Sequence, residues 1–161
     1  MSYRTRFMAI AAATLMAMPA LSDGIMVMDP YARAASPVAK SGAAFMTLHN
    51  MSGQDDRLIA ARTDAAKRVE LHTHVETGDG VMQMREIDGG IPMAAGEMVK
   101  MVRGGKHVML MGLTGPLVQG SDIDVTLVFE TAGEVMVTIP VDNERAPEAG
   151  AHGGDHGAVT N

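Results

Sequence analysis

The 161-residue sequence carries 19 acidic and 13 basic residues, which gives a formal net charge of −6 at neutral pH. This acid excess argues against a protein that binds nucleic acid or an anionic membrane surface, because like charges repel. The sequence has no cysteine, which excludes disulfides, cysteine nucleophiles and thiolate metal sites, including the His2Cys site of blue-copper proteins. It has 16 methionines and no tryptophan, so methionine must fill part of the core.

The first residues have the pattern of a secretory signal peptide. Arg4 and Arg6 precede an apolar run over residues 7–18, and small residues follow at Ala20 and Ser22. A basic flank, an apolar run and a small-residue exit in this order are typical of a cleaved export signal. We expect cleavage after Ser22, with Ala20 as the alternative, and location in the periplasm. The run is too short to anchor the protein, and no later apolar run reaches the ~18 residues of a membrane span.

Short apolar segments separated by turn residues fill most of the remaining chain, and none shows the periodicity of a helix. Turns are marked by glycine, proline and aspartate, among them Asp29-Pro30, Gly78-Asp79-Gly80 and Gly104-Gly105. We expect Asp29-Pro30 to end the first strand, and residues 91–93 to lead into a turn at Gly96. The expected strands are residues 25–28, 43–49, 57–61, 68–75, 81–87, 98–102, 106–113, 122–129 and 134–141.

Many short strands at this spacing predict an all-β fold, either a β-sandwich or a β-barrel. We expect residues 1–22 to be the signal peptide and residues 23–145 to form one domain, because that length suits a single hydrophobic core. From residue 146 to residue 161, glycine, alanine, histidine and aspartate dominate and little can be buried. This last segment is therefore expected to be a disordered tail.

The strand expected over residues 106–113 carries an unusual set of side chains on one face. Successive residues of a strand point to opposite faces. His107, Met109 and Met111 therefore share one face, and the aliphatic residues between them, Val108 and Leu110, share the other. Thioether sulfur is a poor ligand for zinc, calcium or magnesium, but it suits Cu(I). An imidazole beside thioethers therefore indicates a site for a soft metal ion.

Two further strands supply partners for His107 and Met109. On one of them His72 and His74 share a face, and Met84 lies on the strand that returns after the glycine turn. Either histidine, together with Met84, His107 and Met109, would give a His2Met2 set of four neutral ligands on neighbouring strands. Neutral nitrogen and sulfur ligands favour Cu(I) over Cu(II), and such a set persists in an oxidising compartment where paired cysteines form disulfides.

Five segments between about residues 29 and 141 carry a resemblance to a known family: DPYAR, AAFMTLHN, VELHTH, MQMR and GGKHVMLMGL. They resemble the periplasmic copper chaperone family PCu(A)C. The family pattern is a histidine, ten residues, a methionine, 21 residues and then His-x-Met. By resemblance it falls on His72, Met84, His107 and Met109, with His74 as the alternative first ligand. Both spacings are one residue longer in this sequence, and each extra residue can sit in a glycine turn without disturbing strand register.

The resemblance implies a cupredoxin-like, Greek-key β-barrel or sandwich that binds copper at its surface. It also implies delivery of Cu(I) to the Cu(A) centre of cytochrome c oxidase, alongside a thioredoxin-like copper protein. No Ser-His-Asp or cysteine nucleophile motif stands out, so we do not expect an enzyme. The competing interpretation is a secreted β-sandwich interaction module in which methionine serves only for packing.

Other residues near these motifs are assigned lesser roles. His152 and His156 in the tail form a candidate weak Cu(II) site. Met82 and Met111 share faces with the expected ligands, and we expect them to shield the copper or to form a docking surface. Glu70 is expected to be a solvated charge. Core packing is expected of Met26, Met28, Met46, Met98, Met101 and Met136.

Overall fold

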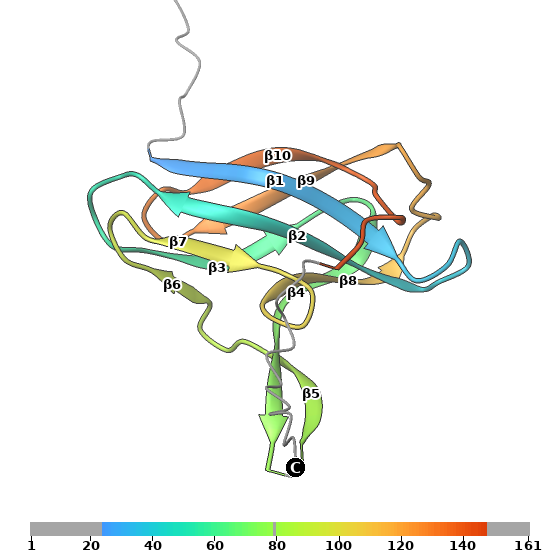
Figure 1. The fold of residues 1–161 in the computed structure, drawn as a ribbon. Coiled ribbons are helices and arrows are strands. Elements are labelled where there is room, and N and C mark those ends of the chain that lie inside the picture. Colours follow the sequence, from blue (N-terminus) through green and yellow to red (C-terminus); the bar gives the residue numbers. More distant parts are fainter. Residues whose placement is uncertain (1–23, 79, 148–161) are drawn as a thin grey trace, which may run out of the picture.

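The computed structural model describes residues 24–78 and 80–147, in which every regular element is a β-strand (Figure 1). The expected signal peptide and nearly all of the expected tail lie outside the described residues. Within the described part of the chain, no helix is long and apolar enough to cross a membrane. The strands are β1 (Ile25–Ala34), β2 (Ser41–Asn50), β3 (Asp56–Arg62), β4 (Ala66–Thr77), β5 (Val81–Glu86), β6 (Ile91–Met93), β7 (Met98–Met101), β8 (His107–Leu113), β9 (Asp122–Phe129) and β10 (Glu134–Pro140).

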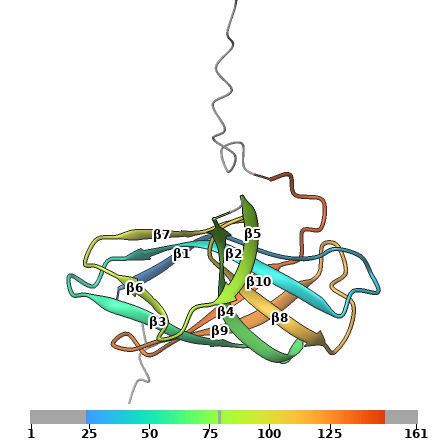
Figure 2. The ribbon, with the colours of Figure 1, turned by 90° about the horizontal axis from the view of Figure 1, so that it is seen from below.

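The strands form two antiparallel sheets that pack face to face (Figure 1, Figure 2). The larger sheet has the order β1-β2-β8-β4-β5, with β7 also paired to β2, and the smaller sheet has the order β10-β9-β3-β6. Leu48, Val108 and Leu110 of the larger sheet and Leu58 and Leu127 of the smaller sheet are fully buried in one core. The expected all-β, single-domain fold is therefore confirmed, as an open sandwich rather than a closed barrel.

The hairpin of β4 and β5 extends beyond the sandwich. β4 pairs with β8 only as far as His72, whereas its pairing with β5 runs from His72 to Thr77. Every residue of β5 is exposed, and β5 forms one edge of the larger sheet. Figure 1 shows the hairpin projecting from the body of the protein, and Figure 2 is seen from the side on which it projects.

Two expectations about strand boundaries are wrong. Asp29 and Pro30 do not end the first strand, because β1 continues through them with a register shift and a φ of 48° at Asp29. Since β1 is an edge strand whose partner in the sheet is β2, the missing N–H of Pro30 interrupts no second ladder. Residues Ile91–Met93, expected to lead into a turn, form β6, and Ile91 and Met93 are buried in the core.

The expectation that methionines within strands pack in the core is right for some and wrong for others. Met46 and Met101 are 2% and 1% exposed. Met26, Met98 and Met136 are between 45% and 75% exposed, because strand alternation places them on the outer faces of the sheets. A methionine in a strand therefore predicts a packing role only when the buried face of that strand is known.

Asp56, at the start of β3, is a buried carboxylate that holds the turn between β9 and β10. Its side chain accepts hydrogen bonds from the backbone N–H groups of Arg57, Thr131 and Ala132 at 2.7–2.9 Å. Burial acts to raise the pKa of Asp56, but these N–H donors outweigh it, so the pKa lies below its ordinary value. The ionised form is therefore the one that the fold stabilises.

We expect Asp56→Asn to lower the free energy of unfolding by about 2 kcal/mol at neutral pH, because an amide accepts weaker bonds and brings an unpaired NH2. The folded pKa lies below the unfolded value of about 3.9, so the stabilisation is present above that pH and is lost as pH falls through the folded pKa. The difference between the wild-type protein and the variant should therefore shrink in acid. Urea unfolding at neutral and acidic pH measures both effects.

The matched control for this variant is Asp55→Asn. Asp55 is exposed and accepts one hydrogen bond, from the backbone N–H of Ala95 at 3.0 Å. An exposed bond of this kind contributes about 1 kcal/mol or less. Equal destabilisation of the two variants would contradict a special role for the buried carboxylate.

Candidate metal centre

The strand register places the predicted ligands on the outer face of the larger sheet, where β4, β5 and β8 meet. His72 is the cross-strand neighbour of His107, and His74 is the cross-strand neighbour of Met84. Met109 lies two residues beyond His107 on β8 and therefore on the same face. Val108 and Leu110, which alternate with His107 and Met109 along β8, point into the core and are fully buried. The alternation inferred for this strand from the sequence is confirmed.

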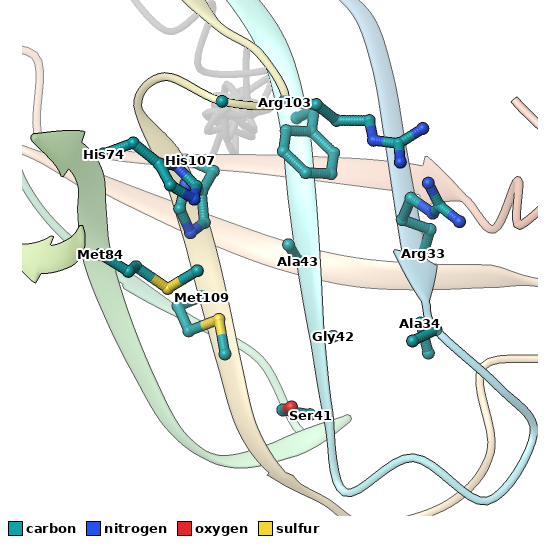
Figure 3. Close-up of a pocket in the computed structure, with 13 residues that line it drawn as sticks. Arg33, Ala34, Ser41, Gly42, Ala43, His74, Met84, Arg103, His107 and Met109 are labelled. Atoms are coloured by element: carbon teal, nitrogen blue, oxygen red, sulfur yellow. The ribbon is translucent and has the colours of Figure 1, made fainter. Parts of the chain in front are cut away.

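A pocket of about 390 Å³ opens on this face and brings four of these side chains together. Its lining includes His74, Met84, His107 and Met109, and Figure 3 shows the two imidazoles beside both methionine side chains. The ring centroids of His74 and His107 are 5.4 Å apart. Met84 is 46% exposed, whereas His107 is 2% exposed. The pocket therefore combines a buried imidazole with an exposed thioether on the projecting hairpin.

The turn before β8 sets the orientation of both imidazoles. Gly104 has a φ of 81°, and the N–H of Gly105 donates to the carbonyl of Val102 at 3.0 Å, which closes a tight turn. The carbonyl oxygen of Gly105 lies 3.0 Å from Nδ1 of His107 and 3.4 Å from Nδ1 of His74. Because a carbonyl oxygen only accepts hydrogen bonds, each Nδ1 carries the proton. Each Nε2 is then left with a lone pair that can bind a metal ion.

His107 is held in a packed environment that favours its neutral form. Its ring centroid lies 5.9 Å from that of Phe45 and 5.9 Å from that of His72. Burial lowers the pKa of His107, the hydrogen bond to Gly105 acts in the opposite direction, and the charges of His74 and His72 lower it further. His107 is therefore neutral at neutral pH, which is the form that binds metals.

His72 lies next to the pocket but does not line it. Its Nε2 is 2.8 Å from a carboxylate oxygen of Glu70, and the other oxygen of Glu70 is 3.0 Å from Nε of Arg68. Within the described residues, Nδ1 of His72 is the one buried side-chain nitrogen or oxygen without a hydrogen-bond partner. The expectation that Glu70 is a solvated charge is wrong, because its side chain is 14% exposed and paired on both oxygens.

The pocket joins Met84, His107 and Met109 of the predicted ligand set with His74, the alternative first ligand, rather than with His72. Two imidazole nitrogens and two thioether sulfurs are neutral donors that suit a soft ion such as Cu(I). Sequence reasoning left the two histidines as alternatives because they lie on one face of one strand. The pairing of β4 with β5 separates them, since it sets His74 opposite Met84.

The sequence analysis did not single out the three largest of the other side chains that line the pocket, which are Arg33, Phe45 and Arg103. Arg33 is the cross-strand neighbour of Ala43 on β2, and Ala43 is that of Met109 on β8. Arg33 and Phe45 both fall in segments that carry the family resemblance, which was the signal available. Their place beside the pocket follows only from the pairing of β1, β2 and β8.

Comparison with solved structures defines the class of fold. The copper-bound PCuAC domain from PmoF2 is 26% identical to this chain with a TM-score of 0.61, and the match covers 74% of this chain and 93% of that one. Cu(I)-bound DR1885 from Deinococcus radiodurans is 31% identical with a TM-score of 0.57, covering 78% of this chain and 84% of that one. The protein thus has the fold of a PCuAC domain, and the predicted resemblance is confirmed.

Comparison of sequences gives the family. The family model described as "Putative lipoprotein LpqE-like" matches residues 25–141. The protein named "Putative lipoprotein Lxx21020" from Leifsonia xyli subsp. xyli is 34% identical over 120 residues, which are 74% of this chain and 70% of that protein. The chain belongs to the LpqE-like family.

Proposed function

We propose that this protein is a periplasmic copper chaperone that binds Cu(I) in the pocket between β4, β5 and β8. In this proposal the four ligands are Nε2 of His74, Nε2 of His107 and the sulfurs of Met84 and Met109. The observation that carries it is the pocket lining, which gathers two imidazoles and two thioethers from three strands. The Cu(I)-bound state of DR1885, which shares the fold, supports copper as the ion.

The different exposure of the ligands supports transfer rather than storage. Met84 lies on an exposed edge strand and Met109 is half-buried, whereas His107 is buried. Ligands of an approaching protein would therefore reach the thioethers first, and the buried imidazole would be the last to release the ion. Four neutral ligands hold Cu(I) without a charged group that would lose its counter-charge, or would have to take up a proton, when the ion leaves.

Export is part of the proposal. The LpqE-like family and the Leifsonia protein are named as lipoproteins, which implies export of those proteins. We propose that residues 1–22 direct this chain to the periplasm and are removed there. Attachment of a lipid to a cysteine sulfur is not part of this proposal, because the 161 residues contain no cysteine.

The proposed recipient is the Cu(A) centre in the copper-bearing subunit of cytochrome c oxidase, with a thioredoxin-like copper protein acting alongside. This choice rests on the resemblance to the PCu(A)C family. We propose binding and transfer without turnover, because four protein ligands would leave no open position at which the ion could take a substrate.

The first test is an anaerobic Cu(I) titration of residues 23–161 in competition with a Cu(I) chelator. We expect one tightly bound Cu(I) per protein. The loaded protein is then mixed with the metal-free copper-bearing domain of the oxidase, and copper is measured in both proteins after separation. Absence of Cu(I) binding would leave the interaction-module interpretation, and binding without transfer would reject this recipient.

Copper affinity should fall in acid, because protons compete with the metal for imidazole nitrogen. The pKa of His107 is lowered by burial, so this ligand stays neutral at and above neutral pH and titrates below the ordinary histidine value of about 6.5. We expect a nearly constant Cu(I) affinity above about pH 7 and a fall of about tenfold per pH unit per protonated imidazole well below it. Competition titrations at pH 5 to 8 measure this, and a flat profile would contradict imidazole ligation.

A further inference from the structure

Two arginines line the copper pocket on the side away from the projecting hairpin. Arg33 lies on β1 and Arg103 lies in the turn before β8, and both are half-buried. Figure 3 shows both guanidinium groups across the pocket from His74 and Met84. They form a local positive region in a chain whose formal net charge is −6.

The strand pairing connects Arg33 directly to the proposed copper ligands. Arg33, Ala43 and Met109 are successive cross-strand neighbours on β1, β2 and β8, so their side chains share one face. Two strand spacings separate the backbones of Arg33 and Met109, which is about 10 Å. Ala43, which lies between them on β2, has a short side chain, so the bottom of the pocket between Arg33 and Met109 lies close to the backbone.

Within the described part of the chain, neither of these two arginines is paired with a carboxylate. Nη2 of Arg33 and Nη1 of Arg103 each donate one hydrogen bond of 3.4 Å, to the backbone carbonyls of Asn143 and Arg145. Among the described residues, ion pairs are recorded for four other arginines but not for these two. A guanidinium has five N–H donors in a planar fork that fits a carboxylate, so most of the donors here are left for a ligand.

We propose that Arg33 and Arg103 bind a carboxylate of the protein that takes copper from the pocket. This inference rests on the proposed function, and it assigns the partner an acidic segment beside its copper-accepting side chain. Because the rest of this chain carries an acid excess, an acidic partner is repelled elsewhere and attracted here, which orients the encounter. The ~10 Å between Arg33 and Met109 corresponds to about three residues of extended chain. The partner's acid therefore lies about three residues from its first copper ligand.

The test uses two synthetic peptides that share a tryptophan and a Met-x-x-Met segment. One peptide carries two aspartates three residues before the first methionine, and the other carries asparagines there. Because this protein contains no tryptophan, the anisotropy of peptide fluorescence reports peptide binding alone. With copper-free residues 23–161 at low salt, we expect the acidic peptide to bind about tenfold more tightly than the neutral one. This preference should vanish in about 0.5 M salt.

The decisive variant is Arg33→Gln/Arg103→Gln, which should lose the preference for the acidic peptide. The matched control is Arg57→Gln/Arg62→Gln on β3 of the smaller sheet, which changes the net charge equally and should keep the preference. Circular dichroism checks both folds, and Arg103→Gln alone, a change in a turn, replaces the double variant if that one does not fold. Equal loss in both double variants, or no preference in the wild-type protein, would overturn the proposal.

Two further measurements separate this inference from binding of small carboxylates and from the proposed copper function. Acetate at the same carboxylate concentration should not displace the acidic peptide, and full displacement would assign the arginines to small carboxylates instead of a protein segment. The Cu(I) affinity of the Arg57→Gln/Arg62→Gln control should equal that of the wild-type protein, because neither arginine lines the pocket. If the wild-type protein binds no Cu(I), the proposed function fails, while the peptide measurements on copper-free protein still decide whether the arginines bind a carboxylate.

Discussion

Replacing His107 by alanine and Met109 by leucine together is expected to lower the Cu(I) affinity of residues 23–161 by about 100-fold or more. The two changes remove one imidazole nitrogen and one thioether sulfur from the four proposed ligands, and both residues line the pocket. The remaining imidazole and thioether supply only two of the four proposed donors. Anaerobic competition with a Cu(I) chelator measures the loss.

The controls for this variant separate lost ligation from lost structure. His107 is 2% exposed, so its removal leaves a cavity, and thermal unfolding must show that the variant is folded at the assay temperature. Met109→Leu alone conserves volume and should reduce stability by less than about 1.5 kcal/mol. Met136→Leu changes a methionine that is 75% exposed on β10 and should leave the affinity unchanged.

The double variant also tests where else copper could bind. Equal Cu(I) affinity in the wild-type protein and in this variant would place the copper site elsewhere. Weak Cu(II) binding that survives in the double variant and disappears with His152→Ala/His156→Ala would identify the tail site expected from the sequence. Those two histidines lie outside the described residues, so only this measurement addresses them.

His74→Ala is expected to lower Cu(I) affinity by about 10- to 100-fold, whereas His72→Ala should lower it by about threefold or less. His74 lines the pocket opposite Met84, and its Nδ1 is oriented by the carbonyl of Gly105. His72 instead uses Nε2 to contact Glu70. The same competition assay compares the two alanine variants directly.

The reverse result would have a specific structural meaning. If His72→Ala abolished binding and His74→Ala did not, His72 would be the ligand assigned by resemblance, and its buried and unpaired Nδ1 would be the nitrogen available to the metal. That outcome would require the His72 ring to turn toward the pocket. Loss of His72 leaves Glu70 with its contact to Arg68, and thermal unfolding checks that both alanine variants are folded.

Much of the fold could be predicted from local sequence patterns. Turn residues and alternating apolar residues predicted nine of the strands and the all-β class, because both signals act within a few residues of the chain. The strand boundary at Asp29-Pro30 was wrong, since proline ends a strand only where its missing N–H would face a second partner. β6 was missed because three residues with a proline carry almost no periodic signal.

The sequence by itself determined which side chains are available and which of them share a strand face. It placed His107 and Met109 on one face after a glycine turn, and it excluded thiolate ligands entirely. These conclusions follow from the two-residue period of a strand and from composition, which no tertiary contact can change.

Only the tertiary structure shows that His74 lines the pocket with the methionines, that Glu70 is paired, and that Arg33 and Arg103 line the pocket. Each of these depends on the register between strands that are distant in the chain, such as β1 with β2 or β4 with β8. Register is set by the burial of whole strand faces against the core, so no short motif encodes it.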